Sequence, residues 1–291
     1  MKNKIILGSA NFDQAYGIKK NFIKKSEIRK LFNIASKNNI KTIDTSPVYN
    51  KSEKIIGLLN KNRFRIISKI PKKPENIKKK NIKKWLKRSV ILSLKNLKVK
   101  KFECLLLHDA NSLLSKDGEE IYKSMSDMKI SEFTKTIGIS IYDFNILDKI
   151  LKKFKFDLIQ VPLNIFDQRL IDTGWLKKLK KKRIEVHARS VFLQGILLLK
   201  RNKLPKKLKK LNKHWITWEN WLKKNQLNPL QACLSFILNQ RKLDGIVVGC
   251  DNKDQLNQIL KLKQSKMENN FSRLNLNIKN RKLIDPREWS N

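Results

Sequence analysis

Four residues at or near the ends of apolar segments could together deliver a proton to an oxygen atom. Asp44 and Tyr49 lie in the stretch TIDTSPVYN, Lys69 ends RIISK, and His108 ends ECLLLH. A tyrosine phenol has a reference pKa of ~10, and a nearby ammonium lowers that pKa by stabilising the phenolate. Lys69 could supply the ammonium, Asp44 could keep Lys69 protonated, and His108 could orient a carbonyl oxygen. Each residue alone has an ordinary structural explanation, such as helix capping or packing, so the hypothesis rests on their joint placement.

The elements that must position these residues are eight short apolar segments, each followed by a helical pattern. Several segments are continuous in Ile, Val and Leu, which is typical of parallel strands buried on both faces. The expected strands are 4–9, 41–45, 65–69, 103–108, 135–140, 157–161, 184–190 and 245–249. The expected helices are 26–39, 52–60, 80–97, 118–129, 143–152, 173–182, 229–239 and 253–263.

This alternation favours an α/β fold, a single-domain (β/α)8 TIM barrel. We expect the barrel domain to span 1–265 and a C-terminal tail, 266–291, to pack on or near the barrel mouth. A basic stretch with tryptophans, 200–228, precedes the seventh barrel helix and is expected to be an insertion over the mouth. Ser26 is expected to cap the helix at 26–39. The alternative is a doubly wound sheet, but LGSANFDQAYG after the first strand contains no GxGxxG phosphate turn.

Polar residues lie at or one position before the ends of seven of the eight apolar segments. In a barrel these ends open onto one face, where the chemistry of such folds takes place. Packing alone does not require polar side chains at so many strand ends, so the pattern predicts a functional mouth. The residues at these positions, with a glycine at the eighth, are Ser9, Asp44, Lys69, His108, Ser140, Gln160, Arg189 and Gly249.

The composition is strongly basic, with 66 Lys and Arg against 25 Asp and Glu and a net charge of +41. Such a balance would ordinarily indicate a nucleic acid or an anionic membrane as partner. Lysines occur in every segment, however, together with an excess of Ile and Asn, which favours drift toward AT-rich codons over a specific nucleic-acid site. Three dispersed cysteines indicate neither a disulfide framework nor a zinc site and fit a reducing cytoplasm. No uncharged stretch approaches the ~18 residues of a membrane span, and nothing indicates the oligomeric state.

In these segments the chain resembles the aldo-keto reductase family. The resemblance is carried by LGSANFDQAYG, KTIDTSPVYNKSEKIIG, IISK, LLLHD, TIGIS, LIQVPLN, ARSVFLQGIL and VVGCDNKDQL, and covers roughly residues 4–262. It implies NAD(P)H-dependent reduction of an aldehyde or ketone on a barrel without a metal. By the same resemblance Tyr49 is the general acid, Lys69 lowers its pKa, Asp44 pairs with Lys69, and His108 orients the substrate carbonyl.

The resemblance also implies a cofactor site, with NADP(H) expected over NAD(H). Ser140 and Gln160 match positions that hydrogen-bond the nicotinamide carboxamide, and Arg189 stands where an aromatic residue commonly stacks on the nicotinamide. Asp251 would meet a 2′-phosphate unfavourably. The candidate cofactor residues are Ser9, Ala10, Ser140, Gln160, Arg189, Ser190, Phe192, Leu193, Gly195, Gly249, Asp251, Gln255 and Gln258.

Three functions remain open from the sequence. The first is reduction of a small carbonyl compound, with a sugar-related substrate suggested by ARSVFLQG and IDPREW. The second is a cofactor-binding barrel that acts as a sensor or scaffold without turnover. The third is a polyanion-binding protein, with RNA or a membrane as partner, in which the +41 charge carries the function.

Overall fold

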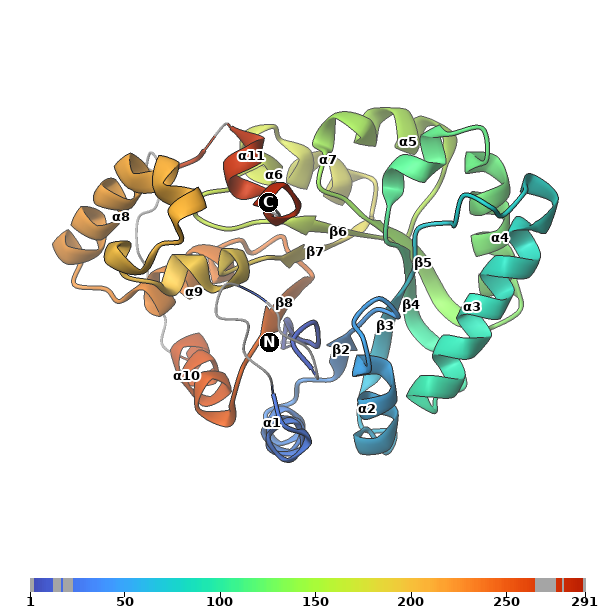
Figure 1. The fold of residues 1–291 in the computed structure, drawn as a ribbon, viewed down its shortest axis with the longest axis horizontal. Coiled ribbons are helices and arrows are strands. Elements are labelled where there is room, and N and C mark those ends of the chain that lie inside the picture. Colours follow the sequence, from blue (N-terminus) through green and yellow to red (C-terminus); the bar gives the residue numbers. More distant parts are fainter. Residues whose placement is uncertain (1–2, 13–16, 18–22, 265–275, 279, 290–291) are drawn as a thin grey trace.

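The computed structural model describes residues 3–12, 17, 23–264, 276–278 and 280–289, and its strands close into a parallel barrel. Each strand pairs with the next, and the first pairs in parallel with the last, so the expected (β/α)8 architecture is confirmed. Figure 1 shows the helices outside the strands. The strands are β1 Ile5–Gly8, β2 Thr42–Asp44, β3 Arg65–Ile70, β4 Phe102–Leu107, β5 Thr134–Ser140, β6 Leu158–Pro162, β7 Glu185–Arg189 and β8 Gly245–Gly249.

All eight expected helices occur, and shorter helical segments lie between them. The α-helices are α1 Lys25–Lys37, α2 Ser52–Leu59, α3 Ile82–Leu97, α4 Gly118–Ile130, α5 Leu147–Lys153, α6 Arg169–Asp172, α7 Trp175–Lys181, α8 Asn212–Lys224, α9 Pro229–Leu238, α10 Lys253–Gln264 and α11 Arg281–Ile284. The 3-10 helices are η1 Lys79–Asn81, η2 Ala110–Leu114, η3 Phe144–Ile146, η4 Leu193–Leu198, η5 Arg201–Lys203, η6 Lys206–Leu211 and η7 Pro286–Trp289.

Apolar side chains bury the strands from both sides, as the continuous Ile, Val and Leu runs predict. The larger core lies between the strands and the surrounding helices, and α1 contributes Ile28, Leu31, Phe32 and Ala35 to it from one face. A separate small cluster is formed by strand residues alone: Ile6, Ile67, Cys104, Leu106 and Leu158. Together these two layers hold the strand ends in fixed positions.

The start of α1 differs from the expectation. The helix begins at Lys25, and the flanking Lys24 is extended and makes no side-chain cap, so Ser26 lies inside the first turn rather than at the cap. The backbone N–H of Ile28 already bonds to the carbonyl of Lys24, at 3.2 Å, which closes that turn without the serine. At α9, in contrast, Asn228 and Gln231 form a reciprocal capping box with Pro229 in the first turn.

The insertion at 200–228 packs beside loops at the carboxyl ends of the strands. It folds into η5, η6 and α8, and α8 lies at the periphery of the molecule, outside the ring of strands (Figure 1). Trp215 and Trp218 of α8 are buried, and the Trp215 ring packs edge-on against Phe166 with ring centres 5.3 Å apart. Phe166 lies in the loop after β6, so the burial of these large rings holds the insertion against the carboxyl-end face of the barrel.

The described part of the C-terminal segment lies against loops at the carboxyl ends of the strands. Ile278 N donates to Phe166 O at 2.9 Å, in the loop after β6, and Arg281 forms an ion pair with Asp143, in the loop after β5, at 2.9 Å. The first residues of the expected tail, 266–275, lie outside the described residues. Because parallel strands end at one face, these contacts bring residues 276–289 close to the mouth.

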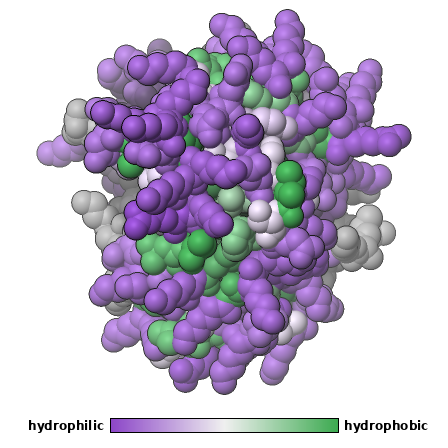
Figure 2. Space-filling view, turned by 90° about the vertical axis from the view of Figure 1, so that its right-hand side faces the viewer, coloured by the Kyte–Doolittle hydropathy of each residue, from purple (hydrophilic) through white to green (hydrophobic). Residues whose placement is uncertain are grey.

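Hydrophilic side chains cover most of the face seen in Figure 2, with an apolar patch near its middle. This is the side of the molecule on which α3 and α4 lie in Figure 1. Exposed large apolar residues on those helices include Leu92 on α3 and Ile130 on α4, which are 59% and 78% exposed. Within the described part of the chain, no helix is long and apolar enough to cross a membrane.

His187 of β7 is a buried histidine away from the strand ends. Its ring leaves no room for a side chain at position 245 of the neighbouring strand β8, since a Cβ at Gly245 would lie 2.6 Å from the ring Cδ2. Burial lowers the pKa of His187 to about 4, with the Asp44 carboxylate opposing this shift. The imidazole is therefore neutral at pH 7 and must gain a proton in the unfolded chain as the pH falls.

Acid should destabilise the fold through this histidine. The pKa of His187 in the folded chain lies below the ordinary value of 6.5, so the unfolded chain binds the proton first. Stability is therefore retained above about pH 6.5 and lost as the pH falls toward about 4. We expect the melting temperature of His187→Gln to decline less than that of the wild type over this interval. His214→Gln on α8 is the control. An equal decline of the melting temperature in all three proteins would contradict the role of His187 in acid destabilisation.

Candidate active site

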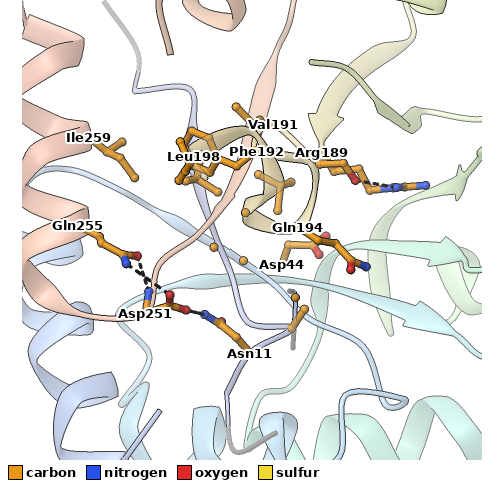
Figure 3. A pocket seen from close by; sticks show the side chains of 18 of the residues that line it. Asn11, Asp44, Arg189, Val191, Phe192, Gln194, Leu198, Asp251, Gln255 and Ile259 are labelled. Carbon is orange, nitrogen blue, oxygen red and sulfur yellow. Dashed lines mark hydrogen bonds between the residues drawn. The ribbon is translucent and has the colours of Figure 1, made fainter. Parts of the chain in front are cut away.

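A cavity of about 780 Å³ opens at the carboxyl ends of the strands, and its size suits a cofactor with a small substrate. Asp44, Tyr49, Lys69 and His108 all line it, so the fold brings together the four residues that the sequence singles out. The cavity continues to the start of α10. Figure 3 shows Arg189, Asp44 and Gln194 on one side of this space and Asp251, Gln255 and Ile259 on the other.

A buried ion pair lies at the catalytic end of the cavity. Lys69 Nζ lies 2.6 Å from Asp44 Oδ1, and the two side chains are 1% and 5% exposed. The ammonium also donates to the carbonyl of Thr45 at 2.8 Å, while the second carboxylate oxygen accepts from Gln160 Nε2 at 2.8 Å. These bonds satisfy most of the polar atoms of the pair, as burial of two charges requires.

Tyr49 is held over this ion pair by a tight turn. Its backbone N–H donates to Ser46 O at 3.0 Å, its carbonyl accepts from Ser52 N at 2.9 Å, and the following Asn50 has a positive φ of 42°. Lys69 Nζ lies 5.3 Å from the centre of the phenol ring. The turn that Pro47 introduces therefore presents the half-buried phenol to the cavity directly beside the ammonium.

The pKa of Tyr49 is raised, which is opposite to the direction expected from the lysine. Burial raises it most, the Asp44 carboxylate raises it further, and the Arg189 guanidinium opposes both. Burial is the largest cause of the shift and outweighs the opposing guanidinium, so the net direction of the pKa is upward, and the effect of Lys69 on this pKa stays a prediction. The phenol consequently keeps its proton at neutral pH, which is the state that a proton donor requires.

His108 follows β4 and lies next to Tyr49, with the two rings 6.3 Å apart and nearly perpendicular. Its backbone N–H bonds to Ile70 O at 3.0 Å, and Nδ1 lies 3.5 Å from Ser46 Oγ. Burial, together with the charges of Lys69 and Arg189, lowers the pKa of His108 to about 4. A neutral imidazole can donate one N–H to a carbonyl oxygen without adding a further charge to the site.

Comparison with known proteins identifies the family of this chain. The family model described as the aldo/keto reductase family matches residues 4–271. This chain belongs to the aldo/keto reductase family. Membership supports an oxidoreductase that acts on small carbonyl compounds, and members of the family use nicotinamide cofactors, usually NADPH. A search of curated proteins found no match to this chain.

Solved structures share the fold of this aldo/keto reductase at low sequence identity. One is PA4992 of Pseudomonas aeruginosa, assigned to the aldo-keto reductases, with 18% identity, 91% of each chain covered and a TM-score of 0.67. Another is the aldo-keto reductase AKR11C1 of Bacillus halodurans in its holo form, with 18% identity and a TM-score of 0.70. That alignment covers 91% of this chain and 88% of the other.

Most of the predicted cofactor residues line the cavity of this aldo/keto reductase. Leu193 does not, because its side chain is fully buried in the outer core and its backbone has a positive φ of 47°. Its prediction as a cofactor residue is therefore not supported. The residues that do line the cavity are Ser9, Ala10, Ser140, Gln160, Arg189, Ser190, Phe192, Gly195, Gly249, Asp251, Gln255 and Gln258.

Ser9 and Gln160 also bond to other parts of the chain. Ser52 Oγ of α2 lies 2.9 Å from Ser9 Oγ and donates to Ser9 O at 3.1 Å, so Ser9 fastens the end of β1 to α2. Gln160 donates to Asp44, while its Oε1 is buried and finds no hydrogen-bond partner among the described residues. An unpaired buried acceptor on the cavity wall fits an incoming N–H donor such as a carboxamide.

Asp251 lies at the opposite end of the cavity, just before α10. Its carboxylate accepts from Asn11 Nδ2 at 3.1 Å and from Gln255 Nε2 at 3.3 Å, and its backbone N–H donates to Gln255 Oε1 at 2.8 Å (Figure 3). Asn252 accepts from Gln255 N at 2.9 Å within the first turn of α10. These bonds hold a negative charge at a defined place on the wall.

Several wall residues are missing from the sequence prediction. The loop after β7 contains Gln194, whose φ of 55° is in the left-handed region and cannot be anticipated from a glutamine. Asn11 and Tyr142 each lie two residues beyond a predicted strand end, and this position in the loop could have predicted that they line the cavity. The missed residues include Asn11, Tyr142, Val191, Gln194, Leu198, Asn228, Gln231 and Ile259. No cluster of potential metal ligands occurs among the described residues.

Removing Lys69 should destabilise the protein far more than removing an exposed lysine. Lys69→Met leaves the Asp44 carboxylate buried without its counter-ion, so we expect a loss of about 3–5 kcal/mol in the free energy of unfolding. Lys135→Met is the matched control, because Lys135 lies 3.0 Å from Glu103 but is 60% exposed. That change should cost less than about 1 kcal/mol. Urea unfolding measures both, and equal losses would contradict the importance of the buried pair.

Proposed function

We propose that this aldo/keto reductase reduces an aldehyde or ketone with NADPH or NADH, and that Tyr49 donates the proton. The observation that carries the proposal is the convergence of Tyr49, the Lys69–Asp44 pair and neutral His108 on one cavity. A protonated phenol and a neutral imidazole can both direct an N–H or O–H toward one carbonyl oxygen. Lys69 lies where its charge would stabilise the phenolate left after proton transfer.

The residues present fit a nicotinamide dinucleotide. Gln160 Oε1 would accept from the carboxamide, Ser140 lies beside it on the wall, and Asp251 with Gln255 borders the far end. When bound, the reduced nicotinamide supplies a hydride to the carbonyl carbon. His108 would orient the carbonyl oxygen, and Tyr49 would transfer its phenolic proton to that oxygen as negative charge develops there. The ammonium of Lys69, held in place by Asp44, would then stabilise the negative charge of the Tyr49 phenolate.

The choice between NADPH and NADH depends on the far end of the cavity. Family usage favours NADPH, whereas the Asp251 carboxylate would repel a 2′-phosphate placed beside it. A sugar-related substrate and a cytoplasmic location stay predictions from the sequence.

Tyr49→Phe should separate chemistry from binding. The substitution removes only the hydroxyl, so we expect cofactor still to raise the melting temperature. Carbonyl-dependent oxidation of NAD(P)H should fall about 10²- to 10⁴-fold, the usual contribution of a positioned general acid. Tyr122→Phe on α4, whose hydroxyl bonds to Lys155 O away from the cavity, is the control. Unchanged turnover in Tyr49→Phe would refute the proton-donor role, and cofactor binding without turnover in the wild type would favour the scaffold alternative.

Asp251→Asn should alter the choice of cofactor. Removing the negative charge takes away repulsion from a 2′-phosphate, so the affinity for NADPH relative to NADH should rise several-fold. Isothermal titration with both cofactors measures the ratio. The asparagine keeps one acceptor oxygen, which can replace the carboxylate oxygen that accepts from Asn11 or the one that accepts from Gln255. A ratio equal to that of the wild type would place the 2′ position away from Asp251.

A further inference from the structure

Arg189 places a positive charge at the catalytic end of the cavity. It ends β7, lines the cavity and is half-buried. Its guanidinium donates to Ile141 O at 2.8 Å and to Ser190 Oγ at 3.2 Å, both of which are neutral. Within the described ranges, no carboxylate forms a salt bridge with it, and these two bonds use two of its five N–H groups.

Neither of the carboxylates that line the described cavity wall, Asp44 or Asp251, forms a salt bridge with Arg189. Lys69 is paired with Asp44 inside the barrel, and Asp251 lies at the other end of the cavity. The guanidinium acts on both catalytic rings, since it contributes to the low pKa of His108 and opposes the raised pKa of Tyr49. Arg189 therefore faces the same space in which the carbonyl group is expected to react.

The guanidinium is held in place by a stack that reaches the C-terminal segment. Arg189 Cζ lies 3.7 Å from the centre of the Tyr142 ring, and Arg287 Cζ lies 3.6 Å from it. Two groups this close to one ring centre must occupy its two faces. Arg287 is bound by the buried carboxylate of Asp285 through bonds of 2.6 and 2.9 Å. Arg189 is thus positioned before any ligand binds, which lowers the cost of recognition.

We propose that Arg189 binds an anionic group of the substrate, so that the substrate class is a carbonyl compound bearing a carboxylate or a phosphate. This inference rests on the proposed function. A lone guanidinium beside a nicotinamide that becomes cationic on oxidation is unfavourable, and a substrate anion would neutralise it. A guanidinium fork also matches the paired oxygens of both anions.

Matched substrate pairs test the inference. The first pair is succinic semialdehyde and its methyl ester, and the second is glycolaldehyde phosphate and glycolaldehyde. We expect wild-type kcat/KM to favour the charged member of at least one pair by about tenfold or more, the usual gain from a charge-assisted hydrogen bond. The pair that shows the preference identifies carboxylate or phosphate. Arg189→Met should reduce the charged-to-neutral ratio to about one, and Arg189→Lys should retain part of the preference.

The charged-to-neutral ratio of kcat/KM distinguishes binding of the substrate anion from a general effect of Arg189 on the active site. If Arg189→Met lowers kcat/KM for charged and neutral aldehydes equally, Arg189 serves the cofactor or Tyr49 instead, and the inference is overturned. A wild-type enzyme that reduces the neutral aldehydes without preferring the charged ones also overturns it, while leaving the proposed function intact. Failure to reduce any of the four aldehydes would overturn both. Melting temperatures of both variants verify that they are folded.

Discussion

The buried contact between Lys69 and Asp44 organises the catalytic end of this barrel. Two charges removed from water are tolerated only where they meet closely and where neighbouring dipoles complete their hydrogen bonds. Thr45 and Gln160 provide those bonds, so the pair links β2, β3 and β6 in one arrangement. The phenol of Tyr49 lies against this unit and takes its electrostatic environment from it.

Much of this arrangement was predictable because the order of the strands in the sequence determines which residues lie at the mouth of a barrel. Parallel strands buried on both faces produce continuous apolar runs, and their carboxyl ends meet at one face. Polar residues ending such runs therefore converge, as Asp44, Lys69 and His108 do. Local geometry was not predictable in the same way. Whether Leu193 faces the cavity depends on its left-handed backbone, and the start of α1 depends on Lys24 rather than on Ser26.

Two further features depend on contacts between distant segments. The tryptophan-bearing insertion packs through Trp215 on Phe166 of the loop after β6, a contact that the local sequence does not predict. The pKa of Tyr49 depends on the balance between burial, Asp44 and Arg189, and the sequence gives their order but not their distances. Charge pairing at the site is therefore a property of the folded chain, whereas the high net charge of +41 is a property of its composition.

The stack of Arg189, Tyr142 and Arg287 has a spectroscopic consequence. An aromatic ring shifts the magnetic resonance of nuclei held above its faces, and both guanidinium groups lie within 4 Å of the ring centre. Their side-chain signals would be displaced from those of arginines in solvent. Because one arginine belongs to β7 and the other to the C-terminal segment, a single spectrum could report whether this segment is docked, even in the resting protein.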